Sequence, residues 1–181
     1  MATKKSTPSW ADVKARLTDL DRAGWFSLLQ DLYAASKDNQ AFLHARLRLG
    51  DDVLKPYKLT LERWLRPDGF KNQDTSVAKA RKAIADYSKA SGAADGLAEL
   101  MVFYCEHATA FCCDVGMDDE SYLGALVRMF ERASKAVSAL PATQQDPLWA
   151  RLEAVRDRSQ AIGYGVDDNV AVLFAQHRGD D

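Results

Sequence analysis

The chain has 181 residues, enough to bury a hydrophobic core without disulfides or a structural metal. Its composition, 47% hydrophobic and 28% charged, fits a globular protein and excludes a disordered one. A formal net charge of −2 gives no overall attraction to nucleic acid or to an anionic membrane. The first ten residues lack the apolar segment of a secretion signal, so we expect a cytoplasmic protein with reduced cysteines.

Charge is unevenly distributed along the chain. Residues 44–90 carry 11 basic and 6 acidic side chains, a net +5, whereas residues 91–131 carry 1 basic and 8 acidic side chains, a net −7. Two interpretations stay open. Either the solvent-facing sides of the helices simply differ in composition, or the surface has two poles that attract a charged partner.

Helical patterns begin after residues 1–8, which we expect to form a flexible tail. Ser9 followed by Asp12 is typical of a helix N-cap, and Asp21 has the position of a second cap. A third helix is expected to end at Gly50, and its short link to the second predicts an antiparallel hairpin. The residues expected to face inward in these three helices are Trp10, Val13, Leu17, Leu20, Trp25, Leu28, Leu29, Leu32, Tyr33, Phe42, Leu43 and Leu47.

Two further helices are predicted before residue 92. Pro56 fits only the first turn of a helix, which places a fourth helix at about residues 54–65, followed by a polar loop over residues 66–74. A fifth helix starts at Thr75 or Ser76 and is ended by Gly92. Its polar side carries a row of lysines, Lys79, Lys82 and Lys89.

The densest apolar run, residues 97–115, holds all three cysteines and no Lys or Arg. Apolar residues lie on nearly every side of a helix with this sequence, and such a helix is buried. We therefore predict a central buried helix at about residues 94–114. Glu99 and Glu106 interrupt the run, which makes it a poor membrane span.

The remaining residues also have helical patterns. Acidic side chains at Asp118, Asp119 and Glu120 favour the start of a helix, because the helix dipole places partial positive charge there. Pro141 ends that helix, and Asp146 followed by Pro147 predicts the start of the next. A turn at residues 163–165 precedes a last short helix. The sequence therefore predicts a single all-α domain over residues 9–176, with about nine helices packed as hairpins around the central helix and frayed residues 177–181.

A family resemblance is carried by four segments, LLQDLYAASKDNQAFLHARL, AKARKAIADYSKAS, LAELMVFYCEHATAF and GMDDESYLGALVRMFERA. Over about residues 17–140 they resemble a bacterial family of small all-helical proteins of unknown function, through helical periodicity together with Tyr33, Tyr87, Glu106 and Tyr122. The resemblance implies an all-α domain of this length and implies no activity.

Possible metal ligands gather in the central helix at Cys105, His107, Cys112 and Cys113. Zinc needs about four converging ligands. Cys105 and Cys112 lie two helical turns apart, about 10 Å along the axis, so one ion cannot easily bind both. We interpret all four as core residues and predict no metal and no cofactor. A further ligand from His44 or His177 is the alternative.

Glu99 and Glu106 are seven residues apart and share one face of the central helix. A buried acid with a raised pKa could transfer protons, although such acids more often pair with Tyr or Arg. Glu106 and His107 are therefore kept as candidates for a buried site, and no residue is assigned a catalytic role.

The sequence holds no recognised catalytic motif. We therefore expect a non-enzymatic helical module that binds another protein, with Asp118, Asp119 and Glu120 as the candidate surface. One alternative is binding of nucleic acid or another anion by residues 44–90, with Lys79, Lys82 and Lys89 as the surface. Another is an enzyme or metal site near Glu106 and His107. No membrane association is expected, and the oligomeric state stays open.

Overall fold

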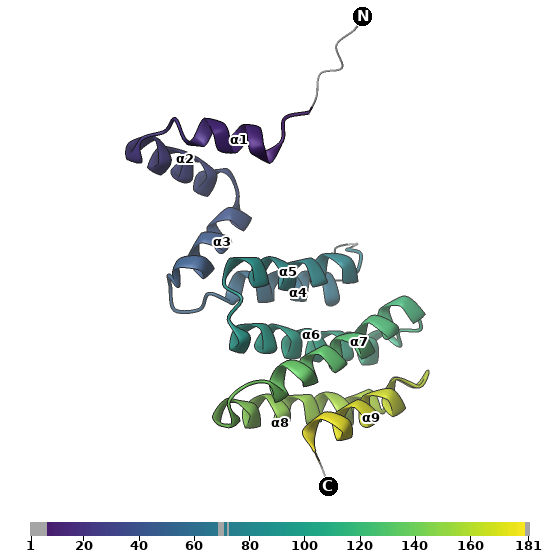
Figure 1. Ribbon diagram of the computed structural model, residues 1–181. Helices are drawn as coiled ribbons and strands as arrows, with labels where there is room; N and C mark the ends of the chain where they lie inside the picture. The colour runs from purple at the N-terminus through teal and green to yellow at the C-terminus, as the bar shows by residue number, and fades with distance from the viewer. Residues whose placement is uncertain (1–6, 69–70, 72, 180–181) are drawn as a thin grey trace, which may run out of the picture. The chain divides into compact units, whose positions relative to one another are not determined.

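A computed structural model of the chain describes residues 7–68, 71 and 73–179 (Figure 1). These residues form nine α-helices and no strand, which confirms the predicted all-α fold. The chain divides into two compact units, Met1–Leu43 and His44–Asp181. The single domain expected over residues 9–176 stays a prediction. Residues 1–6 and 180–181 of the expected tails, and residues 69, 70 and 72 of the expected loop, lie outside the described part.

The first unit contains two short helices with well-formed N-termini. α1 (Trp10–Leu17) begins with a capping box, in which the Asp12 backbone N–H donates to the Ser9 hydroxyl and the Ser9 N–H donates to the Asp12 carboxylate at 2.7 Å. α2 (Arg22–Ala35) begins at Asp21, whose carboxylate accepts the Gly24 N–H at 2.8 Å. Both predicted caps are therefore present.

The expected hairpin of the second and third helices is wrong. Only one extended residue, Ser36, separates α2 from α3 (Lys37–Leu47), whereas a helical hairpin needs a loop of about two to five residues. The Asn39 and Gln40 side chains instead donate to the carbonyl groups at the end of α2, those of Leu32 and Tyr33, at 2.7 and 3.1 Å.

The residues expected to face inward in the first helices are also not buried. No residue of α1 or α2 is buried, and Trp10 is 70% exposed. Leu17, Leu28 and Leu43 are half-buried, and the other predicted inward residues are exposed: Trp10, Val13, Leu20, Trp25, Leu29, Leu32, Tyr33, Phe42 and Leu47. The predicted helices are present, but two short helices are too few to enclose a core of their own.

The second unit is a stack of three helical hairpins (Figure 1). The hairpins are α4 (Lys55–Leu65) with α5 (Val77–Ala90), α6 (Ala94–Val115) with α7 (Glu120–Ser138), and α8 (Ala142–Ser159) with α9 (Val166–Arg178). Their first helices pack side by side, with α6 between α4 and α8, and α7 packs along α9. The Tyr122 hydroxyl, on α7, donates to the Leu65 carbonyl at 2.7 Å and so satisfies the C-terminal end of α4.

The central helix α6 matches the predicted range, and half of its 22 residues are buried. It ends at Gly116, whose left-handed φ of 64° is typical of a glycine C-cap. At its start it lies against α5 so closely that a Cβ at Gly96 would be 2.1 Å from the Tyr87 hydroxyl. No helix of the described chain, α6 included, is both long and apolar enough to span a bilayer.

The predicted start of the eighth helix at Asp146 is wrong. α8 begins at Ala142, directly after Pro141, and holds Pro147 inside. A proline at this position removes the hydrogen bond to the Thr143 carbonyl and crowds that carbonyl, but Thr143 lies in the exposed first turn, where the carbonyl can tilt outward and be hydrated. The helix therefore tolerates Pro147 in its second turn, and the proline does not mark the start of the helix.

Candidate functional site

The carboxylates of the central helix belong to a cluster of ion pairs that joins α4, α6 and α8. Arg151 donates to both oxygens of Glu106, at 2.8 and 2.6 Å, and to Glu99 at 2.5 Å. Lys58 pairs with Glu99 at 2.7 Å. The sequence placed Glu99 and Glu106 on one face correctly. It did not identify Arg151, which lies 45 residues beyond Glu106 and has no local pattern that marks it.

The carboxylates of this cluster are ionised and paired with cations, as in a structural ion-pair network. Burial raises the pKa of Glu99, but the hydrogen bonds from Arg151 and Lys58 outweigh this effect and the pKa is lowered. A carboxylate held ionised between two cations is a poor proton donor, and both oxygens of Glu106 are already occupied. Neither Glu99 nor Glu106 is therefore free to act as a general acid or base.

His107 packs against an aromatic ring rather than against the carboxylates. Its imidazole lies 4.1 Å from the Phe103 ring, centroid to centroid, and its buried Nδ1 has no hydrogen-bond partner in the described chain. Burial lowers the pKa of His107. The half-buried, neutral ring contributes mainly to packing.

The cysteines of the central helix are free thiols. Cys105 and Cys112 are buried, and burial raises the pKa of both, that of Cys112 to about 12. A thiol with so high a pKa stays protonated and is a poor nucleophile and metal ligand. Within residues 7–68, 71 and 73–179, no three His, Cys, Asp or Glu side chains are arranged to hold a metal ion.

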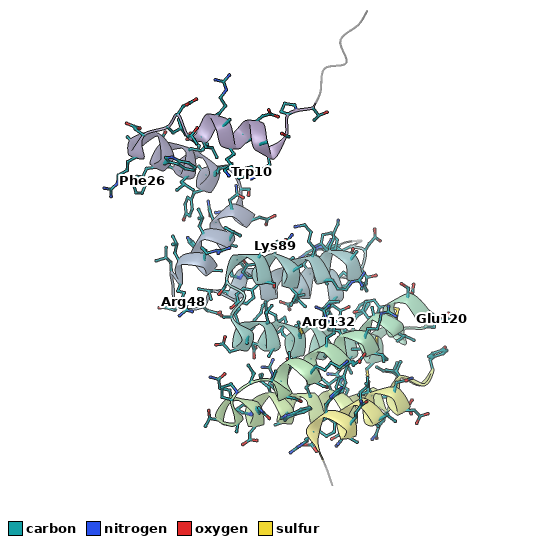
Figure 2. The ribbon with its side chains drawn as sticks, in the orientation of Figure 1. Trp10, Phe26, Arg48, Lys89, Glu120 and Arg132 are labelled. Atoms are coloured by element: carbon teal, nitrogen blue, oxygen red, sulfur yellow. The ribbon has the colours of Figure 1, made fainter. Side chains whose placement is uncertain are left out.

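The acidic residues before α7 lie together at its exposed N-terminus. Asp118, Asp119 and Glu120 are all exposed, and Figure 2 marks Glu120. The Asp119 carboxylate accepts the Tyr122 N–H at 2.8 Å and so caps the helix. One of the three candidates thus has a structural role that accounts for its presence.

The lysine row of α5 is partly engaged by other side chains. Lys79 lies over the Trp64 ring, 3.8 Å from its centroid, and Lys82 pairs with Asp86 at 2.5 Å. Lys89 is exposed near the end of the helix (Figure 2). The row is therefore less available to an outside anion than the sequence suggests.

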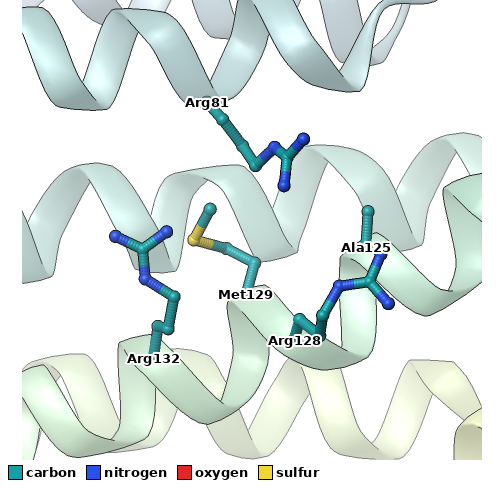
Figure 3. A pocket seen from close by; sticks show the side chains of 5 residues that line it. All are labelled: Arg81, Ala125, Arg128, Met129 and Arg132. Carbon is teal, nitrogen blue, oxygen red and sulfur yellow. The ribbon is translucent and has the colours of Figure 1, made fainter.

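A basic groove that sequence reasoning missed opens between α5 and α7 (Figure 3). It has a cavity volume of about 90 Å³, is open to solvent, and is lined by Arg81, Ala125, Arg128, Met129 and Arg132. We call it the arginine groove. Arg128 and Arg132 are one turn apart on α7, but Arg81 is 47 residues before Arg128, and residues 91–131 have a strongly acidic composition. The acidic average over residues 91–131 gives no sign of Arg128, so the sequence did not predict this basic site.

A second surface is apolar and belongs to α1, α2 and the link between them. We define the N-terminal apolar surface as Trp10, Val13, Leu20, Trp25, Phe26, Leu29 and Leu32, all exposed. Figure 2 marks Trp10 on α1 and Phe26 on α2. The sequence identified most of these residues, but assigned them to a core.

No family model, curated protein or solved structure matches the chain. The resemblance to a helical family of unknown function therefore stays a prediction, and a function has to be argued from the geometry of this chain.

Proposed function

We propose that the protein is a non-enzymatic interaction module that binds another protein through the N-terminal apolar surface. The observation that supports this function is that α1 and α2 bury no residue, while the seven side chains of this surface are 38–70% exposed. Monomeric proteins rarely leave so many large apolar side chains of two consecutive helices in water, because burying them is worth about 25 cal/mol per Å². A partner that covers them gains this free energy.

The chemistry of the surface favours a protein as the partner. Residues 9–35 carry three basic and four acidic side chains, Lys14, Arg16 and Arg22 against Asp12, Asp19, Asp21 and Asp31. Helices that lie on membranes, and surfaces that bind nucleic acid, instead carry an excess of Lys and Arg. Two tryptophans and a phenylalanine are typical of the centre of a protein interface. The expected partner therefore presents an apolar surface.

The caps of both helices support the same function. The capping box at Ser9 and the Asp21 cap hold α1 and α2 in helical form before a partner binds. Less conformational entropy is then lost on binding, which raises affinity for a given contact area.

The earlier alternatives have less support. An acidic surface at residues 118–120 includes the structural cap Asp119, and nucleic-acid binding by the lysine row would have to displace Lys79 from Trp64 and Lys82 from Asp86. An enzyme at Glu106 would have to displace Arg151.

Site-specific photo-crosslinking in cells of the native host tests the proposal. A photoreactive phenylalanine analogue replaces Phe26 in the N-terminal apolar surface, or Val172 as a matched control, since Val172 is 65% exposed on α9. We expect a discrete covalent product with one other protein from position 26 and not from position 172. The additional substitution Trp10→Ser should abolish that product.

Other results would refute the proposal. Identical products at positions 26 and 172, or none at position 26, would mean that the surface has no specific partner. A covalent dimer of the chain as the only product would assign the surface to self-association instead. Size-exclusion chromatography with light scattering on the purified protein would check that result.

A further inference from the structure

The three arginines of the arginine groove have no partner of opposite charge. Arg81, Arg128 and Arg132 make no ion pair with any residue in the described part of the chain, and the neighbouring carboxylates are taken, Asp86 by Lys82 and Glu131 by Lys135. Arg128 and Arg132 are four residues apart on one helix, a spacing at which like charges destabilise the helix. The concentration of positive charge is therefore not explained by the stability of the fold.

The helices form a recess for these side chains. α5 packs against α4, and α7 packs against α9. Each of the two helices that line the groove is therefore held in place by a neighbouring helix. Arg81 reaches from α5 toward the two arginines of α7, and Met129, which is buried, lies between them (Figure 3). Burial raises the pKa of the phenol of Tyr104, and the positive charges of Arg81 and Arg128 act in the opposite direction.

A helical glycine makes room for one of the guanidinium groups. A Cβ at Gly124 would be 3.1 Å from Nη1 of Arg128 and 3.7 Å from its Nη2. A glycine inside a helix is less favourable than an alanine, because its backbone loses more conformational freedom on folding. Gly124 therefore allows Arg128 to lie back along α7 at the edge of the groove.

We propose that the arginine groove binds the phosphoryl dianion of a small phosphorylated molecule. One carboxylate is satisfied by a single bidentate arginine, whereas a phosphoryl group carries about two negative charges and at least three acceptor oxygens for guanidinium donors from two helices. Among the described residues, Met129 and Ala125 line the groove with apolar side chains, and its charged lining consists of the three arginines. This site is separate from the N-terminal apolar surface, and either proposal can fail without the other.

Isothermal titration calorimetry on the full chain at constant ionic strength tests the site. The probes are pyrophosphate, inorganic phosphate and phenyl phosphate, with acetate as a monoanionic control. We expect saturable binding of the phosphoryl probes and none of acetate. Tighter binding of phenyl phosphate than of inorganic phosphate would identify an ester as the natural form, and the reverse order would identify the free anion.

Substitutions then localise the site. Arg128→Gln and Arg132→Gln should each weaken pyrophosphate binding at least tenfold, which corresponds to about 1.4 kcal/mol. Arg16 is an exposed arginine of α1, outside the groove. Arg16→Gln removes one positive charge there and should change the affinity for pyrophosphate less than twofold. Gly124→Ala should weaken binding several-fold while the thermal midpoint stays equal or rises, a combination that a general loss of structure would not give.

Four results would overturn the proposal, three of them in the experiments above. These three are no saturation by any phosphoryl probe, equal weakening by Arg16→Gln and the groove variants, and binding of acetate as tight as that of phosphate. A single-stranded oligonucleotide that displaced pyrophosphate at much lower concentration than phenyl phosphate would also overturn it, since the site would then serve a polyanionic backbone.

Discussion

At the scale of single residues, Arg151 holds together charges from three helices. Its side chain is about a third exposed and is the common partner of Glu99 and Glu106. Arg151→Met leaves two half-buried carboxylates without their shared cation, and we expect the free energy of unfolding to fall by about 1–3 kcal/mol. Lys135→Met breaks the exposed Glu131–Lys135 pair and should lower the free energy of unfolding far less, because solvent screens an exposed ion pair. Urea denaturation measures both, and equal losses would contradict a special role for Arg151.

His107 gives stability a dependence on pH. Because burial lowers its pKa below the ordinary 6.5, the unfolded chain binds a proton at a higher pH than the folded chain does. The contribution to stability is thus complete above about pH 6.5 and is lost as the pH falls toward the folded-state pKa. His107→Phe keeps a ring against Phe103, and we expect it to lose less stability than the wild type between about pH 7 and pH 5 in urea titrations. A loss as large as that of the wild type would place the pH dependence elsewhere.

At the scale of the helices, alanine substitutions of two glycines, Gly96 and Gly124, are expected to affect stability differently. A Cβ at Gly96 would lie 2.1 Å from the Tyr87 hydroxyl, and that ring is buried and touches Tyr57, so it cannot move away easily. Gly96→Ala should therefore force α5 and α6 apart and lower the free energy of unfolding by about 1–3 kcal/mol or more. A Cβ at Gly124 meets only the mobile end of Arg128, so Gly124→Ala should cause no loss. Thermal unfolding compares the two, and similar losses would contradict this account of the close approach.

The same helices show which features could be predicted from the sequence. Ser9, Asp21 and Asp119 form side-chain caps, and Gly116 is a left-handed C-cap, because these interactions join residues only a few positions apart. The central helix was identified from the composition of a single segment. Local chemistry thus decides where most helices begin and end, with Pro147 as the exception that the exposed first turn of α8 permits.

Contacts between distant residues could not be predicted in this way. The apolar stripes of α1 and α2 have the same periodicity as that of α7, yet no residue of α1 or α2 is buried, whereas nine residues of α7 are. The arginine groove likewise needs Arg81 to lie opposite Arg128, which depends on how two hairpins stack. Periodicity gives the direction of an apolar face, whereas burial depends on what packs against it.

At the scale of the whole molecule, the core lies entirely in the second unit. Every buried residue of the described chain lies between Ala45 and Phe174. A fragment that begins at Lys37, at the first residue of α3, should therefore keep the urea midpoint and cooperativity of the full chain. The same fragment lacks the N-terminal apolar surface and should compete for no partner in the crosslinking experiment, while it binds pyrophosphate like the full chain. A lower midpoint or a broader transition would show that the first two helices stabilise the hairpin stack, and the apolar surface would then need a different explanation.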